Sequence, residues 1–312
     1  MPLAVKIGYA VAMALAPDVL VRAIAQADDL RIIAAVTTGA VREAVHRHAL
    51  AGAAAQVIGR AITSGLLLAT MTKGEERVTL QLVGDGPLRS VTADANAAGD
   101  VRAYVARPEA ALPPIAPGPP RLGAALGRTG VLTVVRDLGM RELYQGRVSL
   151  FNGEVDEDVE RYLRQSEQVA SALSCEVVLD PEGHVLRAAG ILVQALPGGH
   201  SDVVARADVR FRDGALWALL EHDDVDARRL AEQLSPSQPI EFLADRTLRF
   251  RCTCSAERIY NTLRMLTHRD LDEMIDEGKP ATVTCNFCNT THSVPLSELR
   301  RIRDALPARS SN

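Results

Sequence analysis

Four of the five cysteines of this chain fall into two close pairs near its C-terminal end, and this pattern restricts the fold more than any other feature. Cys252 and Cys254 lie in "RFRCTCSAER", and Cys285 and Cys288 lie in "VTCNFCNT". Apolar alternation predicts a strand over 248–254, which would point both thiols of the first pair to one side. The second pair reads as a tight turn around a common point. Two such pairs can converge as a four-sulfur site, the arrangement typical of structural zinc, and in a cytosolic chain they favour zinc over a disulfide.

The residues around these pairs predict a small module at 252–312. Apolar side chains at helical spacing indicate a helix after Cys254, Thr267 can cap a second helix, and strand-like residues flank the CxxC turn as a hairpin. A last helix follows Pro295. So few large apolar side chains provide little stability, whereas a structural zinc ion contributes roughly 10–16 kcal/mol of apparent binding free energy. We therefore expect a zinc-binding domain whose folding depends on the metal.

Residues 1–198 predict an α+β domain with a mixed sheet. Strand-like runs occur at Val78–Val83, Leu88–Ala93 and Val101–Val105 and again beyond residue 130, whereas helical spacing appears in blocks. Helical spacing is also present at Leu20, Ala23 and Ile24, which predicts a helix there. Regular strand–helix–strand alternation is absent from the sequence, which favours α+β over a doubly wound fold.

The segment 199–251 differs in character from both neighbours. From residue 200 to 251 it has eight arginines and ten acidic residues, with a sparse apolar series. That series consists of Leu216, Leu219, Leu220, Leu230 and Leu234. The pattern predicts amphipathic helices that depend on a neighbour for burial, so we interpret 199–251 as a charged, partly helical connecting segment.

Composition and charge argue against a membrane protein, a general nucleic-acid binder and a secreted protein. We find no apolar run of the roughly 18–20 residues needed to cross a bilayer, which argues against a membrane partner. The net charge of −4 gives no general attraction to nucleic acid. The apolar stretch Ile7–Ala16 is similar to a secretion signal, but Pro17 after it and the single Lys6 before it favour a buried strand and the start of a helix. We expect a soluble, cytoplasmic protein.

Other candidate groups predict no catalytic site. Cys175 lies in a strand-like run and is interpreted as a small buried side chain rather than a further redox thiol. Gly84-Asp85-Gly86 predicts a turn, since Arg89 stands where a dinucleotide fingerprint needs glycine. His46 and His48 are interpreted as surface or packing residues. His268 and His292 lie near the cysteines and could replace a ligand, but four thiols already complete the shell of a zinc ion. Because no nucleophile has an evident base, we expect a protein that is not an enzyme.

Two alternative functions remain beside these observations. A zinc ribbon can bind nucleic acid, but residues 252–312 carry eight basic and eight acidic side chains, without the positive field that phosphate contacts require. A CxxC pair can exchange disulfides, but it usually does so in a thioredoxin-like context. The thiols themselves leave two possibilities open, a permanent structural site or a redox-gated one, because thiolates bind zinc and also react with oxidants.

The chain resembles the 33 kDa heat-shock chaperonin family of redox-regulated holdases over nearly its whole length. The resemblance rests on the CxC and CxxC pairs and on segments such as "TTGAVREAVHRH", "GRAITSGLLLATM", "LQLVGDGPLRSVTADANAAGDVRAYV", "YQGRVSLFNGEVDEDVERYLRQSEQ" and "FRCTCSAERIYNTLRML". One departure is Ala103, where the family often has glycine.

This resemblance implies an ATP-independent chaperone that binds unfolding client proteins under oxidative stress. It implies that Cys252, Cys254, Cys285 and Cys288 hold one Zn²⁺ when reduced. On oxidation it implies the disulfides Cys252–Cys254 and Cys285–Cys288, release of zinc, unfolding of the C-terminal module and destabilisation of the connecting segment. Exposed apolar surface would then hold clients, usually in a homodimer.

Overall fold

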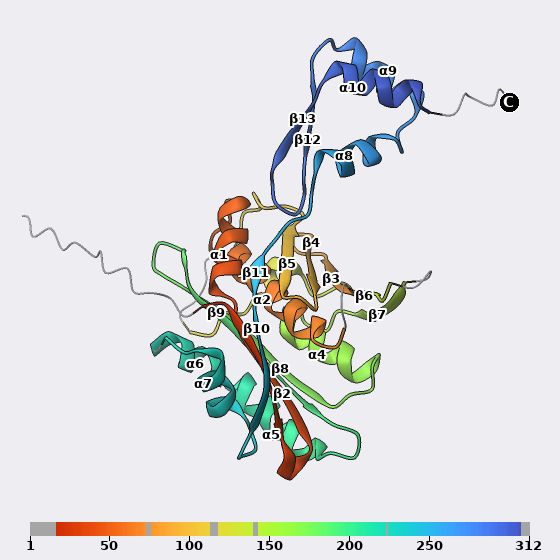
Figure 1. Cartoon of the computed structure of the whole chain (residues 1–312). Coiled ribbons are helices and arrows are strands. Elements are labelled where there is room, and N and C mark those ends of the chain that lie inside the picture. The colour runs from red at the N-terminus through yellow and green to blue at the C-terminus, as the bar shows by residue number, and fades with distance from the viewer. Residues whose placement is uncertain (1–16, 73–75, 113–117, 140–142, 223, 307–312) are drawn as a thin grey trace, which may run out of the picture.

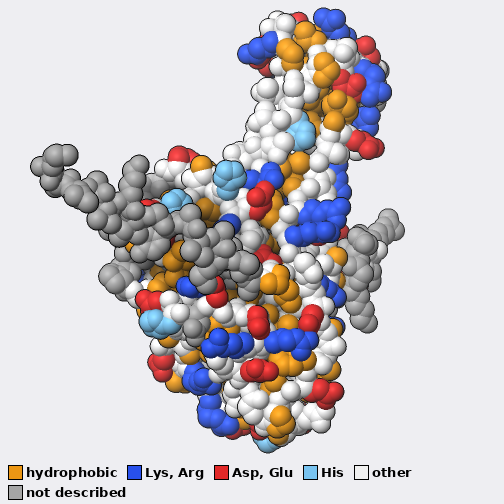
Figure 2. All heavy atoms as spheres, turned by 60° about the vertical axis from the view of Figure 1, so that its left-hand side comes forward, with side chains coloured by type: hydrophobic (Ala, Val, Ile, Leu, Met, Phe, Trp, Pro, Cys, Tyr) orange, Lys and Arg blue, Asp and Glu red, His pale blue; other side chains and the backbone are white. Residues whose placement is uncertain are grey.

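The computed structural model describes residues 17–72, 76–112, 118–139, 143–222 and 224–306. It has a large body, built from two sheets and the helices that pack on them, and a small C-terminal module that projects from one end (Figures 1 and 2). The expected strand and helix start at Ile7–Ala16 lie outside the described residues. The α+β prediction is confirmed.

The first sheet has five antiparallel strands in the order β10-β1-β2-β9-β8. Its strands are β1 (Val19–Ala25), β2 (Leu30–Val36), β8 (Ser171–Leu179), β9 (Val185–Ala195) and β10 (Glu241–Thr247). A short 3₁₀ turn, Gln26–Asp28, joins β1 to β2. The predicted helix at Leu20–Ile24 is therefore wrong. Main-chain pairing with β2 on one side and β10 on the other makes this segment a strand, and apolar side chains on both of its faces are buried.

The second sheet has six strands in the order β11-β5-β4-β3-β6-β7. They are β3 (Arg77–Gly84), β4 (Ser90–Asn96), β5 (Asp100–Val105), β6 (Gly130–Asp137), β7 (Tyr144–Ser149) and β11 (Arg249–Phe250). The predicted strands in 78–105 are confirmed. The strand expected over 248–254 is much shorter, because β11 pairs in parallel with β5 for two residues and the chain then turns away. Gly84 ends β3 in the predicted turn, where a Cβ atom would lie only 2.1 Å from the Leu126 carbonyl oxygen.

Helix α2 (Gly52–Ala69) lies in the main core between the two sheets. Its apolar side chains pack with α1 (Thr38–Arg47) and with the inner faces of both sheets, as do those of α4 (Val155–Gln165) and the short α3 (Gly123–Leu126). Contrary to the sequence prediction, α2 has the length and composition of a membrane-spanning helix, but 94% of it is buried. Small residues such as Gly59 allow this close packing, since a Cβ there would come within 2.5 Å of Val177.

Arg60 of α2 sits inside this core with three carboxylates. Its guanidinium contacts Glu176 at 2.7 Å and Glu154 and Asp156 at 3.2 Å each. Burial raises the pKa of Glu176 to about 7, with help from Asp156 and Glu154 and against the opposing effect of Arg60. This cluster thus has one cation for three acidic groups.

The connecting segment covers the other face of the five-stranded sheet. Helices α5 (Ser201–Arg212), α6 (Ala215–His222) and α7 (Ala227–Leu234) form a second core with that face (Figure 1). Leu216, Leu220, Leu230 and Leu234 of the predicted apolar series are buried there, and Leu219 packs at the edge. After α7 the chain returns through β10 and β11, so the segment 199–251 contributes one strand to each sheet.

The C-terminal module has the local structure that its sequence predicts. It contains α8 (Ala256–Leu263), α9 (His268–Asp276), the hairpin of β12 (Ala281–Thr284) and β13 (Thr291–Val294), and α10 (Leu296–Asp304). Thr267 caps α9 in a reciprocal capping box with Asp270. Among its described residues, seven apolar side chains form a third buried core, separate from the two cores of the body.

Candidate metal centre

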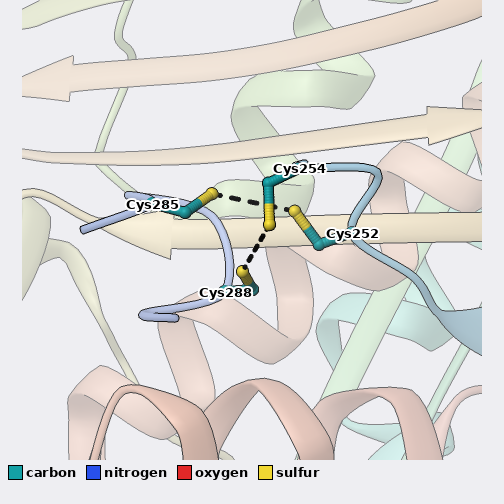
Figure 3. Close-up of side chains that lie close together, drawn as sticks. All are labelled: Cys252, Cys254, Cys285 and Cys288. Carbon is teal, nitrogen blue, oxygen red and sulfur yellow. Dashed lines mark hydrogen bonds between the residues drawn. The ribbon is translucent and has the colours of Figure 1, made fainter. Parts of the chain in front are cut away.

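The two cysteine pairs come from two loops that meet at one point. Cys252 and Cys254 lie between β11 and α8, and Cys285 and Cys288 lie in the turn of the β12–β13 hairpin (Figure 3). The turn is closed by main-chain bonds, in which the Cys285 amide donates to the Thr290 carbonyl at 3.0 Å and the Asn289 amide donates to the Cys285 carbonyl at 2.8 Å. Asn289 has the left-handed conformation, with φ of 55°, that this tight turn needs.

The four sulfur atoms lie within 4.8 Å of one another. The Sγ atoms of Cys252 and Cys285 are 3.7 Å apart, and those of Cys254 and Cys288 are 3.4 Å apart. The side chains point inward from both loops, as Figure 3 shows. The structure therefore brings together all four cysteines that the sequence singles out, in an arrangement that can hold a metal ion.

The protonation of these thiols depends on burial and on one another. Burial raises the pKa of Cys254, and its hydrogen bonds with Cys288 and Cys252 raise it further. Burial also raises the pKa of Cys285, against hydrogen bonds from the amides of Cys288 and Phe287. For Cys288 burial acts upward, but hydrogen bonds with the Thr290 hydroxyl and amide and with the Cys254 and Cys252 thiols together lower its pKa to about 7. Thiolates this close together repel one another, so the four thiols do not all ionise readily. A bound cation would offset this repulsion.

Neighbouring groups that the sequence offers as possible ligands lie elsewhere. His268 begins α9, and His292 is in β13 opposite Val283. Neither belongs to the group of four ligand atoms. Cys175 is buried in β8 within the main core, where burial raises the pKa of its thiol. The CxxC pair lies in a hairpin turn and not at the start of a helix, unlike the context expected of a disulfide oxidoreductase.

Sequence reasoning missed the residues of the body that contact this centre. Arg102 and Tyr104 of β5 touch the Phe287 ring, and the Arg102 guanidinium lies 4.0 Å from the Cys252 sulfur. His48, interpreted from the sequence as a surface or packing residue, has Nε2 3.1 Å from the Phe287 carbonyl oxygen. The available signal was the alternation of polar and apolar residues in β5, which places Arg102 and Tyr104 on the outer face of the sheet.

Comparison with known proteins places the whole arrangement in context. A family model described as Hsp33 protein matches residues 18–295, a range that includes all four clustered cysteines. The 33 kDa chaperonin of Bacillus subtilis is 34% identical over 287 residues, which are 92% of this chain and 98% of that protein. The 33 kDa chaperonin of Geobacter sulfurreducens is 36% identical over 291 residues, covering 93% and 96%. The crystal structure of the 33 kDa chaperonin from Thermotoga maritima superposes with a TM-score of 0.81 at 30% identity, covering 92% of this chain and 98% of that one.

Proposed function

Because the chain belongs to the Hsp33 family of chaperones, we propose that it is a redox-regulated, ATP-independent holdase that binds unfolding proteins under oxidative stress. The observation that carries this proposal is the cluster of four cysteine sulfurs, within 4.8 Å of one another, in a chain of this family. Those thiols are the groups that would sense the oxidant.

In the reduced protein, Cys252, Cys254, Cys285 and Cys288 are the ligands of one Zn²⁺. A tetrahedral site with Zn–S bonds of about 2.3 Å has sulfur–sulfur edges of about 3.8 Å. The observed contacts of 3.7 Å and 3.4 Å are close to that edge length and support a four-sulfur site. When bound, the ion supplies charge compensation for four thiolates and joins the two loops of the module.

Oxidation converts the four thiols into two disulfides and so removes all four ligands. Each disulfide forms when two thiols lose two electrons and two protons. One hydrogen peroxide molecule accepts these electrons and protons and becomes two waters. We propose the pairs Cys252–Cys254 and Cys285–Cys288 from the resemblance to the family. The sulfur contacts at 3.7 Å and 3.4 Å each join one member of each pair, so the reduced geometry by itself does not select this pairing.

Peptide mapping tests the pairing. Trypsin cleavage after Arg251 and Arg258 releases the CxC pair in 252–258, and cleavage after Arg269 and Arg300 releases the CxxC pair in 270–300. After oxidation, the two peptides should separate without reductant, each lighter by two hydrogens. Peptides that remain linked until reduction would show that the disulfides join the two pairs.

The arrangement of the three cores supports the proposal that loss of the metal unfolds the module and releases the connecting segment. The module has a small core of its own, so loss of the metal removes much of its stability. We propose three functional units, 1–198, 199–251 and 252–312, of which the second leaves the body when the third unfolds. Helices α5–α7 cover an apolar sheet face that includes Val21, Ile32 and Ile191, and their departure would expose that face to clients.

Further parts of the proposal concern setting and partners. The oxidised form is a homodimer in the cytoplasm, and it acts by binding clients and not by catalysis. Nucleic acid and membranes are not partners, which is supported by the balanced charge of 252–312 and by the burial of α2. Sedimentation of reduced and oxidised protein tests the dimer.

The central experiment follows zinc release and thiol loss during a peroxide titration, and then aggregation of a heat-unfolding client by light scattering on the same samples. Zinc release should parallel loss of four thiols, and suppression of aggregation should appear with it. Oxidised, zinc-free protein that leaves aggregation unchanged would contradict the proposed function.

A further inference from the structure

The module meets the body at its metal-binding end. Figure 1 shows the β12–β13 hairpin directing its turn toward the body, while α9 and α10 lie at the far end of the module. The contacts with the body come from Cys252 and from Phe287–Asn289 of the turn. A change at the metal centre therefore reaches the body through these few residues and through the chain connection at β11.

Phe287 is the side chain of the module that packs against the outer face of β5, where it is partly buried. Its ring meets Tyr104 edge to face, with ring centres 5.1 Å apart and planes at 89°, the geometry that aromatic pairs prefer. The Arg102 guanidinium lies 4.1 Å from the centre of the same ring. Arg102 is itself held by the buried Asp94 at 2.7 Å, so the receiving site is fixed by the sheet.

The main chain of the turn is held from a second direction, by the C-terminal end of α1. His48 Nε2 lies 3.1 Å from the Phe287 carbonyl oxygen, and Arg47 Nη1 donates to the Cys288 carbonyl oxygen at 3.4 Å. The Asn289 side-chain amide donates to the Arg47 carbonyl oxygen at 2.9 Å. The turn is thus held by both its ring and its backbone.

Strand β5 contacts both the metal-binding turn and β11, through side chains that lie in one row on its outer face. Asp100, Arg102 and Tyr104 alternate along β5 and share its outer face. Asp100 accepts from Arg249 at 2.6 Å and from Arg251 at 3.4 Å, next to the parallel pairing of β11. The same strand therefore holds the end of the connecting segment and, two to four residues further on, the metal-binding turn.

We propose that Phe287 is a metal-dependent latch, seated between Arg102 and Tyr104 when the turn is metal-bound, and that its release frees β11 and with it the C-terminal end of the connecting segment. Phe287 lies between two cysteines of the cluster, so the ring stays in its site only while the turn keeps the shape in which both sulfurs face the same ion. This proposal rests on the proposed function. It identifies the contacts through which loss of the metal would destabilise the connecting segment.

The test uses the reduced, zinc-loaded full chain with Phe287→Ala. The Arg249 and Arg251 amides donate to the Gly99 and Val101 carbonyls at 3.0 and 2.8 Å, so hydrogen exchange of peptides that contain them reports on β11. We expect one zinc per chain, as in the wild type, and exchange of these amides roughly tenfold faster, the size expected for loss of one aromatic pair and one cation–π contact.

Tyr104→Ala removes the partner on the body side, away from the ligands. It should also give faster exchange, by about fivefold, because only the aromatic pair is lost and Arg102 still contacts the Phe287 ring. Phe151→Ala is the matched control, because this ring is 57% exposed and also carries an arginine, Arg161, 5.1 Å from its centre, but it lies outside the latch. The control should leave β11 unchanged. If Phe287→Ala loses zinc, Tyr104→Ala decides the outcome.

Wild-type exchange at β11 in zinc-loaded Tyr104→Ala would overturn the latch. Client aggregation is measured in parallel with oxidised wild type. If oxidised wild type suppresses aggregation while the variants keep β11 protected, the latch fails and the proposed function stands. If oxidised wild type is inactive, the proposed function fails, and the exchange data still report whether Phe287 secures β11.

Discussion

The buried side chain of Arg60 lies in the main core next to more acidic groups than its single charge can balance. One guanidinium, 4% exposed, faces Glu154, Asp156 and Glu176, so the carboxylates exceed the available positive charge. Burial and the neighbouring acids raise the pKa of Glu176 from 4.5 to about 7. A raised pKa means that the folded state binds a proton that the unfolded chain has already lost between pH 4.5 and 7. This contribution to the free energy of unfolding is complete below pH 4.5 and is lost as the pH rises through 7.

Glu176→Gln tests this sign. The neutral amide should match wild type near pH 4.5 and become more stable than wild type by about 3 kcal/mol at pH 8, from 1.36 kcal/mol per unit of pKa. Urea unfolding followed by circular dichroism across this range measures the difference. Glu182→Gln, at an exposed position in the β8–β9 turn, is the control and should follow wild type throughout. A constant difference between Glu176→Gln and wild type at all pH values would show that Glu176 does not titrate there.

Cys285→Ser addresses a single proposed ligand. A hydroxyl in place of a thiolate should lower zinc affinity by at least about tenfold and partly unfold the module under reducing conditions, because metal binding and folding are coupled. Zinc content and circular dichroism measure both effects. Cys175→Ser changes the buried thiol of the main core, outside the cluster, and should keep full zinc content. Wild-type zinc affinity in Cys285→Ser would remove this residue from the ligand set.

The helices of the connecting segment are elements whose burial depends on the sheet beneath them. In α7, Leu230 is fully buried against that sheet while Asp226 caps the helix start by accepting from the Arg229 amide. Many exposed residues of these helices are charged, for example Arg206, Arg210 and Glu232, which agrees with the dependence on a neighbour for burial that the sequence predicts. Their stability therefore comes from one apolar face packed on the sheet. Loss of even one buried side chain from this face should let the segment detach from the sheet more often.

Leu230→Ala should cost about 3 kcal/mol of packing, which corresponds to a roughly hundredfold increase in opening of the segment even with zinc bound. Trypsin cleavage after Arg228 and Arg229 in the reduced protein measures the opening. Leu243→Ala, in β10 where the side chain is 53% exposed, is the matched control and should be cleaved at the wild-type rate. Equal cleavage of Leu230→Ala and wild type would mean that this face does not secure α7.

At the scale of the whole molecule, the separation of three cores means that the parts need not unfold together. The module's core draws on residues from Ile259 to Leu306, whereas the cores of the body end at Phe250. Removal of metal with a chelator, in the presence of reductant, should therefore unfold 256–304 and loosen 199–251, including β10 and β11, while the strands contributed by residues 17–198 stay folded.

Hydrogen exchange checks this outcome peptide by peptide. Amides in α8–α10 should lose protection, and those in β3, β4 and β9 should keep it. Rebinding of zinc should restore the module. A metal-free, reduced module that stays as well protected as the zinc-bound one would contradict the idea that the ion maintains its fold.

The contributions of sequence and tertiary structure differ by the range of the interactions involved. The cap at Thr267 and the β12–β13 hairpin depend on residues within a few positions of one another, so the sequence alone predicted them. The two cysteine pairs meet over about thirty residues, and the sequence predicted this because paired thiols at such spacings are a known metal-ligand pattern. The course of Leu20–Ile24 as a strand was decided by β2 and β10, and β10 lies more than two hundred residues away. The seating of Phe287 against β5 was likewise decided by tertiary contacts, because spacing within a segment carries no information about which distant surface completes its hydrogen bonds and its burial.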